Sequence, residues 1–221
     1  MPSGVVGLPD VKLPTQLTVL RIALVPVFFV LVAVVRPPEI GWAVLVFAIA
    51  AASDWWDGYM ARAMGLVSPL GAFLDPLADK LLTGAAFVAF AWSGYIPWWM
   101  VMIVLARDVF LTVLRRLADS VGVPVKTTYF AKVKTFAQMT FILFVLAALL
   151  GQGMNASSLW GGLGREFFEI GAPLWLMGAV TLLTFVSAVL YGYDNALAFR
   201  EVRALFRRAT DDRSSVKHES V

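Results

Sequence analysis

The sequence predicts an all-α, polytopic membrane protein with six transmembrane helices and both termini in the cytoplasm. Hydrophobic residues make up 60% of the 221 residues and charged residues 15%, against about 45–50% and about 25% in soluble domains. The chain holds six apolar runs, and each is long enough for the roughly 20 residues that a spanning helix needs. Its basic residues gather on one side of these runs, which the positive-inside rule identifies as the cytoplasmic side.

Apolar runs and turn residues place the six helices in order along the chain. Each run ends where proline, glycine or charged residues interrupt it, because these residues favour turns over a continued apolar helix. The expected helices cover about residues 17–35, 40–61, 71–92, 97–117, 130–150 and 173–193. A glycine-rich connection, residues 151–171, is expected between the last two helices.

The helices define the domain organisation and the orientation. Residues 1–16 are expected to form an interfacial N-terminal segment, 17–195 one six-helix domain, and 196–221 a basic C-terminal tail. With six spans both termini lie on one side, and the loops of the opposite side hold only Arg36 and Arg165 as basic residues. Both termini, and the link between the second and third helices, are therefore expected in the cytoplasm.

Composition also limits the chemistry and the partners. The chain has no cysteine, and its only histidine, His218, lies in the charged tail. Thiolate metal sites and cysteine nucleophiles are therefore excluded, and any catalysis must depend on carboxylates. The net charge of +3 is too small to indicate a nucleic-acid partner.

Four carboxylates at the ends of two apolar helices form the most informative pattern. Asp54 and Asp57 are three residues apart, and Gly71, Asp75 and Asp79 follow at intervals of four. At about 100° per residue, each set shares one helix face, and an antiparallel pair of helices can turn all four acids into one cavity. Because acids are costly inside a membrane, cations must balance them. An all-oxygen ligand set selects hard ions, so we expect Mg²⁺ or Mn²⁺, with two ions.

This site is compatible with two classes of function. Gly58, Ala61 and Gly71 leave room for a ligand to approach the helix backbone, and Arg62 could neutralise a phosphate oxygen. Two metal ions beside an arginine suit transfer between phosphates, because the metals stabilise the attacking and leaving oxygens. The same acids suit cation transport, in which intramembrane carboxylates bind and pass ions.

The spacing of eight residues resembles the signature of the CDP-alcohol phosphotransferase family. The matching string is Asp54-x2-Asp57-Gly58-x2-Ala61-Arg62-x8-Gly71-x3-Asp75-x3-Asp79. This resemblance implies a six-helix membrane domain that forms a homodimer. It also implies that Asp79 contributes a metal ligand or acts as the general base, and it assigns two sets of ligands. The metal ligands would be Asp54, Asp57, Asp75 and Asp79, and the CDP-lipid would contact Thr15, Thr18, Gly58, Ala61, Arg62, Ser68 and Gly71.

Three further stretches, 13–21, 73–80 and 132–135, are similar to one branch of this family. That branch transfers a phosphatidyl group from CDP-diacylglycerol to glycerol 3-phosphate and releases CMP, which implies an enzyme of a bacterial-type inner membrane with its active site facing the cytoplasm. An anionic acceptor needs cations, and the candidates are Arg107, Arg115, Lys132 and Lys134. At residues 68–72 this chain has Ser-Pro-Leu-Gly-Ala, where the branch often has Thr-Arg-Phe-Gly-Lys. Because the Arg and Lys are missing, another acceptor within the family, as in a cardiolipin synthase, stays open.

Overall fold

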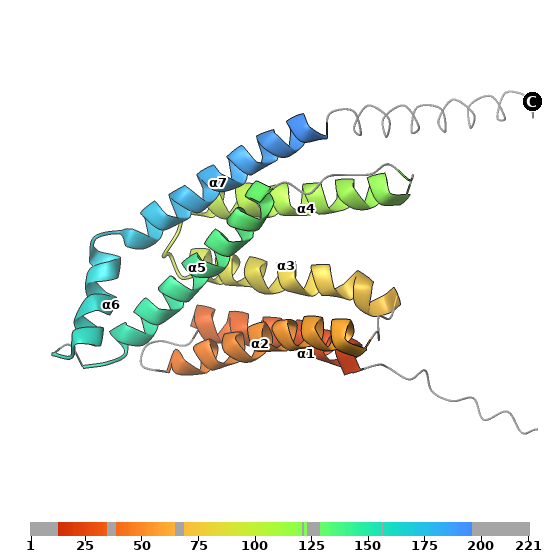
Figure 1. The fold of residues 1–221 in the computed structure, drawn as a ribbon. Coiled ribbons are helices and arrows are strands. Elements are labelled where there is room, and N and C mark those ends of the chain that lie inside the picture. Colours follow the sequence, from red (N-terminus) through yellow and green to blue (C-terminus); the bar gives the residue numbers. More distant parts are fainter. Residues whose placement is uncertain are drawn as a thin grey trace, which may run out of the picture. The chain divides into compact units, whose positions relative to one another are not determined.

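The structure is a computed structural model that describes residues 13–34, 39–64, 69–120, 122, 129–155 and 157–195. Within these ranges it describes the backbone, but not the side chains, of residues 13–17, 54–64, 69–76, 120 and 129–131. The described residues form seven α-helices and no strand (Figure 1). The helices are α1 (Leu13–Val34), α2 (Gly41–Met64), α3 (Pro69–Trp92), α4 (Trp98–Ser120), α5 (Tyr129–Gln152), α6 (Leu159–Glu169) and α7 (Ala172–Asp194).

All six apolar runs are helical, which confirms the all-α class. The first helix starts earlier than expected, at Leu13, so the end of the predicted N-terminal segment is already helical. No helix is predicted from the sequence in the glycine-rich connection 151–171, whereas the structure places the 11-residue helix α6 within it. Its N-cap is Ser158, whose hydroxyl oxygen accepts a hydrogen bond from the Gly161 backbone N–H at 3.1 Å.

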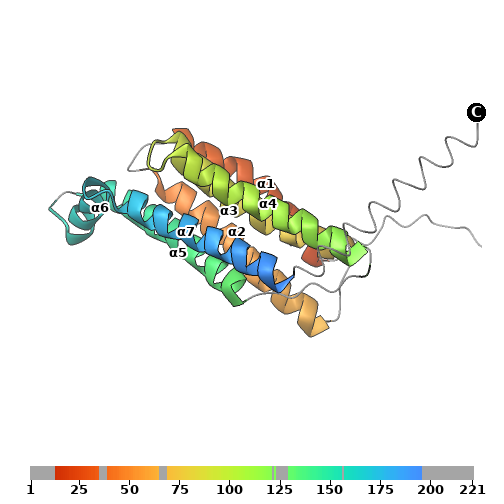
Figure 2. The same cartoon turned by 90° about the horizontal axis from the view of Figure 1, so that it is seen from above.

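The chain divides into two compact units, which are described separately. The first unit contains Met1–Trp98 and Thr140–Leu174. Within it α1 packs along both α2 and α3, and the three helices run side by side in Figures 1 and 2. The ring of Phe28 in α1 packs against the ring of Phe47 in α2 at a tilt of 46°, with the ring centroids 5.4 Å apart.

Glycine explains why α6 packs so closely against the end of α5 in this unit. A Cβ atom on Gly164 would lie 2.6 Å from the carbonyl oxygen of Ala148 and 2.8 Å from the backbone nitrogen of Gln152. A Cβ on Gly151 would lie 2.6 Å from the carbonyl oxygen of Trp160. These glycines, which indicate a loop in the sequence, instead permit a close helix contact.

The second unit contains Trp99–Met139 and Trp175–Val221. It holds nearly all of α4, the first part of α5 and most of α7. Val101 and Val104 of α4 and Met177 of α7 are fully buried. Buried polar groups also connect these three helices, and they are described with the candidate site below.

Two helices of the described residues are long and apolar enough to cross a membrane, namely Lys132–Gln152 within α5 and Ala172–Asp194. Shorter apolar stretches cover Thr18–Val34 and Gly41–Ser53. Large apolar side chains also face outwards, such as Phe136 at 74% and Phe185 at 62% exposure, which is typical of helices that lipid surrounds. Six spans and cytoplasmic termini stay predictions, and both termini lie outside the described residues.

Candidate functional site

The four acids of the motif lie at the two helix ends that the predicted link joins. Asp54 and Asp57 belong to the second half of α2, and Asp75 and Asp79 to the first half of α3. Since both segments are α-helical, the spacings of three and four residues put each pair on one helix face. From Met64 to Pro69 the chain extends at most about 18 Å, so the acidic ends of α2 and α3 stay near each other.

Asp79 lies on the face that α3 buries within the first unit. Later residues of the same face are Thr83, at 8% exposure, and Phe87 and Phe90, at 1% and 0%. The Thr83 hydroxyl donates a hydrogen bond of 3.1 Å to the backbone carbonyl of Asp79. Asp79 itself is half-buried. Asp79 therefore lies where the buried face of α3 changes from apolar to polar residues.

Helix α1 carries a buried cation that contacts the backbone of α2. Arg21 is 1% exposed and Thr18, one turn earlier, is fully buried. The Arg21 Nε donates a hydrogen bond of 3.3 Å to the carbonyl oxygen of Ala50, one turn before Asp54. A buried guanidinium is costly without polar partners, and the Ala50 carbonyl of α2 is one such partner for Arg21.

Most other residues expected around the CDP-lipid lie where only the backbone is described. Thr15 belongs to the first turn of α1, and Gly58, Ala61 and Arg62 continue α2 beyond Asp57. Gly71 lies in the first turn of α3, one turn before Asp75. The side chains of these residues, and those of Asp54, Asp57 and Asp75, lie outside the described part, as does Ser68 as a whole.

Two of the four cations expected at the acceptor come together in the second unit. Lys134 of α5 is 3% exposed, and its Nζ donates to both carboxylate oxygens of Asp108 on α4, at 2.5 Å and 2.6 Å. The Arg107 guanidinium donates from Nη1 to Asp108 Oδ1 at 3.1 Å and from Nη2 to the Ser187 hydroxyl of α7 at 2.6 Å. Arg107 and Lys134 thus share one carboxylate.

The other two predicted cations have different surroundings. Arg115 lies two turns beyond Arg107 on α4, and its guanidinium carbon is 5.9 Å from the centre of the Tyr191 ring of α7. This distance permits a cation–π interaction. Lys132 is exposed whereas Lys134 is buried, so the two lysines lie on different faces of α5.

The structure buries polar residues that were assigned no role from the sequence, and four of them lie at or beside the contacts described above. Asp108 is 9% exposed, Gln138 3%, Ser187 1% and Arg21 1%. For Asp108 a signal was present, because a charged residue in the middle of an apolar helix indicates a functional position or a buried partner. Gln138 and Ser187 give no such signal, since single polar residues are common in apolar helices.

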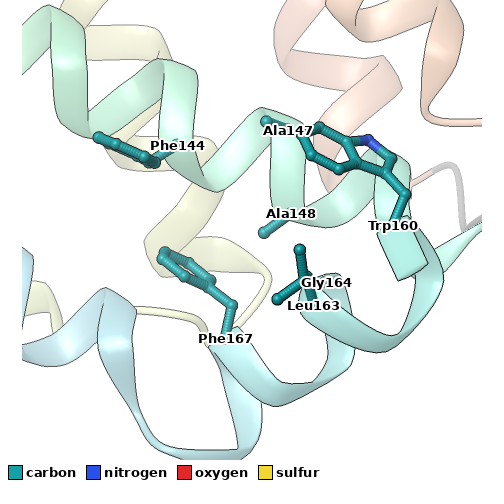
Figure 3. Close-up of a pocket in the computed structure, with 7 residues that line it drawn as sticks. All are labelled: Phe144, Ala147, Ala148, Trp160, Leu163, Gly164 and Phe167. Atoms are coloured by element: carbon teal, nitrogen blue, oxygen red, sulfur yellow. The ribbon is translucent and has the colours of Figure 1, made fainter.

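A separate pocket in the first unit has no catalytic chemistry. It is a cavity of about 170 Å³ between the end of α5 and α6. Figure 3 shows Phe144 of α5 and Trp160 and Phe167 of α6 around it. The remaining lining residues are Ala147, Ala148, Leu163 and Gly164. An apolar wall offers no ligand for a metal ion or a phosphate, so this pocket is not the candidate site.

Comparison with known proteins identifies the family. Residues 11–189 match the CDP-alcohol phosphatidyltransferase family. A CDP-diacylglycerol–glycerol-3-phosphate 3-phosphatidyltransferase of Bacillus subtilis is 37% identical over 152 residues, which are 63% of this chain and 77% of the relative. The enzyme of the same name from Rickettsia bellii is 32% identical over 175 residues, 79% of this chain and 92% of the relative.

A third relative is named for a different product. A Mycobacterium tuberculosis protein with the provisional name of a cardiolipin synthase is 32% identical over 197 residues, which are 89% of this chain and 88% of the relative. The family match covers α1 to α6, most of α7 and all eight residues of the carboxylate motif. The chain therefore belongs to the CDP-alcohol phosphatidyltransferase family and is a phosphotransferase enzyme.

Proposed function

We propose that the protein transfers the phosphatidyl group of CDP-diacylglycerol to glycerol 3-phosphate and releases CMP. The observation that carries this proposal is the pair of acidic helix ends in α2 and α3, whose spacing resembles the signature of the family that the chain matches. The names of the relatives from Bacillus subtilis and Rickettsia bellii support the choice of donor and acceptor. Membership in a transferase family argues against cation transport.

The donor set fits hard divalent ions. Asp54, Asp57, Asp75 and Asp79 supply oxygen only, and the helical spacing pairs them as neighbours on each helix. We propose that these four carboxylates hold Mg²⁺ or Mn²⁺, with two ions. Bound there, the ions would neutralise the charge of the pyrophosphate and of the leaving phosphate.

Asp79 is proposed as the general base. Its carboxylate accepts the proton of the acceptor hydroxyl, and the oxygen attacks the phosphorus that carries the diacylglycerol. The new P–O bond forms as the bond to the bridging oxygen of the pyrophosphate breaks, and CMP departs with that oxygen. A base in hydrogen-bond reach of the attacking hydroxyl contributes about 10²–10⁴-fold to the rate.

The remaining residues of the motif are proposed to hold the donor. Small residues allow the CDP group to approach the backbone of α2 and α3, and Arg62 offers paired N–H groups to phosphate oxygens. The proposed donor contacts are Thr15, Thr18, Gly58, Ala61, Arg62, Ser68 and Gly71. The proposed contacts of the acceptor phosphate are Arg107, Arg115, Lys132 and Lys134.

The surroundings of the enzyme follow from its substrates. We propose a homodimer in a bacterial-type inner membrane with the active site facing the cytoplasm, because the predicted basic loops mark that side. Its partners are membrane lipids, CDP-diacylglycerol and a small alcohol phosphate, without nucleic acid.

The test is CMP release by the purified full-length protein in detergent, with CDP-diacylglycerol and Mg²⁺. We expect turnover with glycerol 3-phosphate and none with inositol phosphate or serine. Phosphatidylglycerol is the critical comparison, because the relative with the cardiolipin synthase name covers more of this chain than the other two. Turnover with phosphatidylglycerol instead would keep the carboxylate chemistry and establish this second candidate. No turnover with any acceptor by folded protein would refute both.

A further inference from the structure

Asp108 is the centre of a buried polar cluster in the second unit. Its carboxylate accepts hydrogen bonds from Lys134 at 2.5 Å and 2.6 Å, from Arg107 at 3.1 Å and from the Gln138 amide at 3.4 Å. These donors come from α4 and α5, and Ser187 of α7 binds the other end of Arg107 at 2.6 Å. One acid thereby fixes side chains of two helices, and through Arg107 it reaches a third.

Two cations of the cluster pair with the same carboxylate. Two cations, Arg107 and Lys134, share the single negative charge of Asp108. The Nε atom of Arg107 is buried and has no hydrogen-bond partner among the described residues. One carboxylate is enough to pair with one buried cation, so a purely structural ion pair gives no reason for a second cation at Asp108. An anionic ligand gives such a reason, because a phosphate would accept hydrogen bonds from both cations.

We propose that Asp108 is a positioning residue for the phosphate of the acceptor. It holds the ammonium group of Lys134 and the guanidinium group of Arg107 in fixed orientations, so that they need no reorganisation when the phosphate arrives. Lysine gains most from such a partner, because its side chain has many rotamers and no preferred direction of hydrogen bonding. This inference rests on the proposed function, since it assigns Arg107 and Lys134 to the acceptor.

The test is the effect of Asp108→Asn on the KM of each substrate. We expect the KM for glycerol 3-phosphate to rise at least about tenfold, because Lys134 loses its bidentate partner, while the KM for CDP-diacylglycerol stays within about twofold of its original value. The matched control is Asp119→Asn, the same change at an exposed position of α4, and it should alter neither value. If both KM values stay unchanged, or if the KM for glycerol 3-phosphate falls, Asp108 does not position the cations.

A second pair of variants separates positioning from mere charge compensation. If Asp108 positions both cations, the double variant Asp108→Asn with Lys134→Gln should have a KM for glycerol 3-phosphate at least as high as that of Lys134→Gln alone, because Arg107 also loses its partner. If Lys134 only compensates Asp108, the double variant would restore the original KM, which overturns the proposal. The double variant also leaves no unpaired lysine, so it stays informative if Asp108→Asn alone does not fold.

CMP release by the unmodified protein distinguishes a failure of the proposed function from a failure of the role proposed for Asp108. Absence of CMP release with glycerol 3-phosphate would refute the proposed function. Normal turnover without a selective change in the acceptor KM of the variants would refute only the role of Asp108.

Discussion

At the scale of single residues, the most specific assignment is that of Asp79. Of the four acids of the motif, Asp79 is the one whose side chain the structure describes. It is half-buried, and it lies one turn before Thr83 on the buried face of α3. Asparagine has nearly the same shape but cannot accept a proton at neutral pH. Replacing Asp79 by asparagine therefore tests the chemistry with little disturbance of the packing.

We expect Asp79→Asn to lower CMP release at least about 100-fold, which is the lower end of what a general base contributes. The measurement is initial rate at saturating substrates, together with the thermal unfolding midpoint of the same preparation. Glu39→Gln is the matched control, since Glu39 is exposed before α2 and its change should leave the rate unaltered. Activity within threefold of normal in Asp79→Asn would remove Asp79 from catalysis.

Individual residues also show where sequence reasoning stops. The spacing of the four acids needs only helical periodicity, so it could be predicted from the chain alone. The pairing of Asp108 with Lys134 joins residues 26 positions apart, and no local pattern encodes which face of α4 meets which face of α5. Arg21 could be counted as a basic residue at the start of a helix, but its burial against Ala50 depends on the packing of α1 on α2.

At the scale of elements, helix α6 is the clearest departure from expectation. Apolar runs identified six helices because a long stretch without breakers has few alternatives to a helix. In α6 the glycines at 161, 162 and 164 suggested a loop, since glycine is a poor helix former. Tertiary contact reverses this preference, because a larger residue at Gly164 would meet the backbone of α5. A contact of this kind is invisible in local composition.

We expect Gly164→Ala to destabilise the first unit by about 1–3 kcal/mol, the usual range for overpacking. The added Cβ would lie under 3 Å from backbone atoms of Ala148, Gln152 and Gly151, so α5 and α6 must separate. Gly192→Ala is the control, because a Cβ there has no neighbour within 4 Å. It should leave the thermal unfolding midpoint equal or higher, since alanine favours helices. An unchanged midpoint in Gly164→Ala would contradict the close contact.

At the scale of the whole molecule, metal binding should stabilise the fold as well as permit turnover. A ligand that binds only the folded protein at 100 times its dissociation constant adds about 2.7 kcal/mol to the free energy of unfolding. We therefore expect Mg²⁺ or Mn²⁺ to raise the thermal unfolding midpoint of chelator-treated protein and to restore CMP release. The rise should disappear in Asp75→Asn. A midpoint shift of the same size in that variant would place the metal elsewhere.

Orientation in the membrane is the prediction that depends on the complete chain. Six helical runs and the one-sided distribution of basic residues predict both termini in the cytoplasm, while the described residues alone contain two full-length candidate spans. The absence of cysteine from the sequence makes a direct test simple, because any introduced cysteine is the only thiol to react.

We expect single cysteines at Ser3 and Ser215 to resist a membrane-impermeant maleimide in intact spheroplasts and to react after lysis. A cysteine at Ser157, an exposed residue before α6, should react in intact spheroplasts, because an odd number of spans separates it from each terminus in the six-helix arrangement. Labelling of all three positions from the same side would require an even number of spans before Ser157. By the same count we expect the acidic ends of α2 and α3 on the cytoplasmic side, since two spans from the N-terminus return the chain to the side of the termini. A water-soluble acceptor is available on that side.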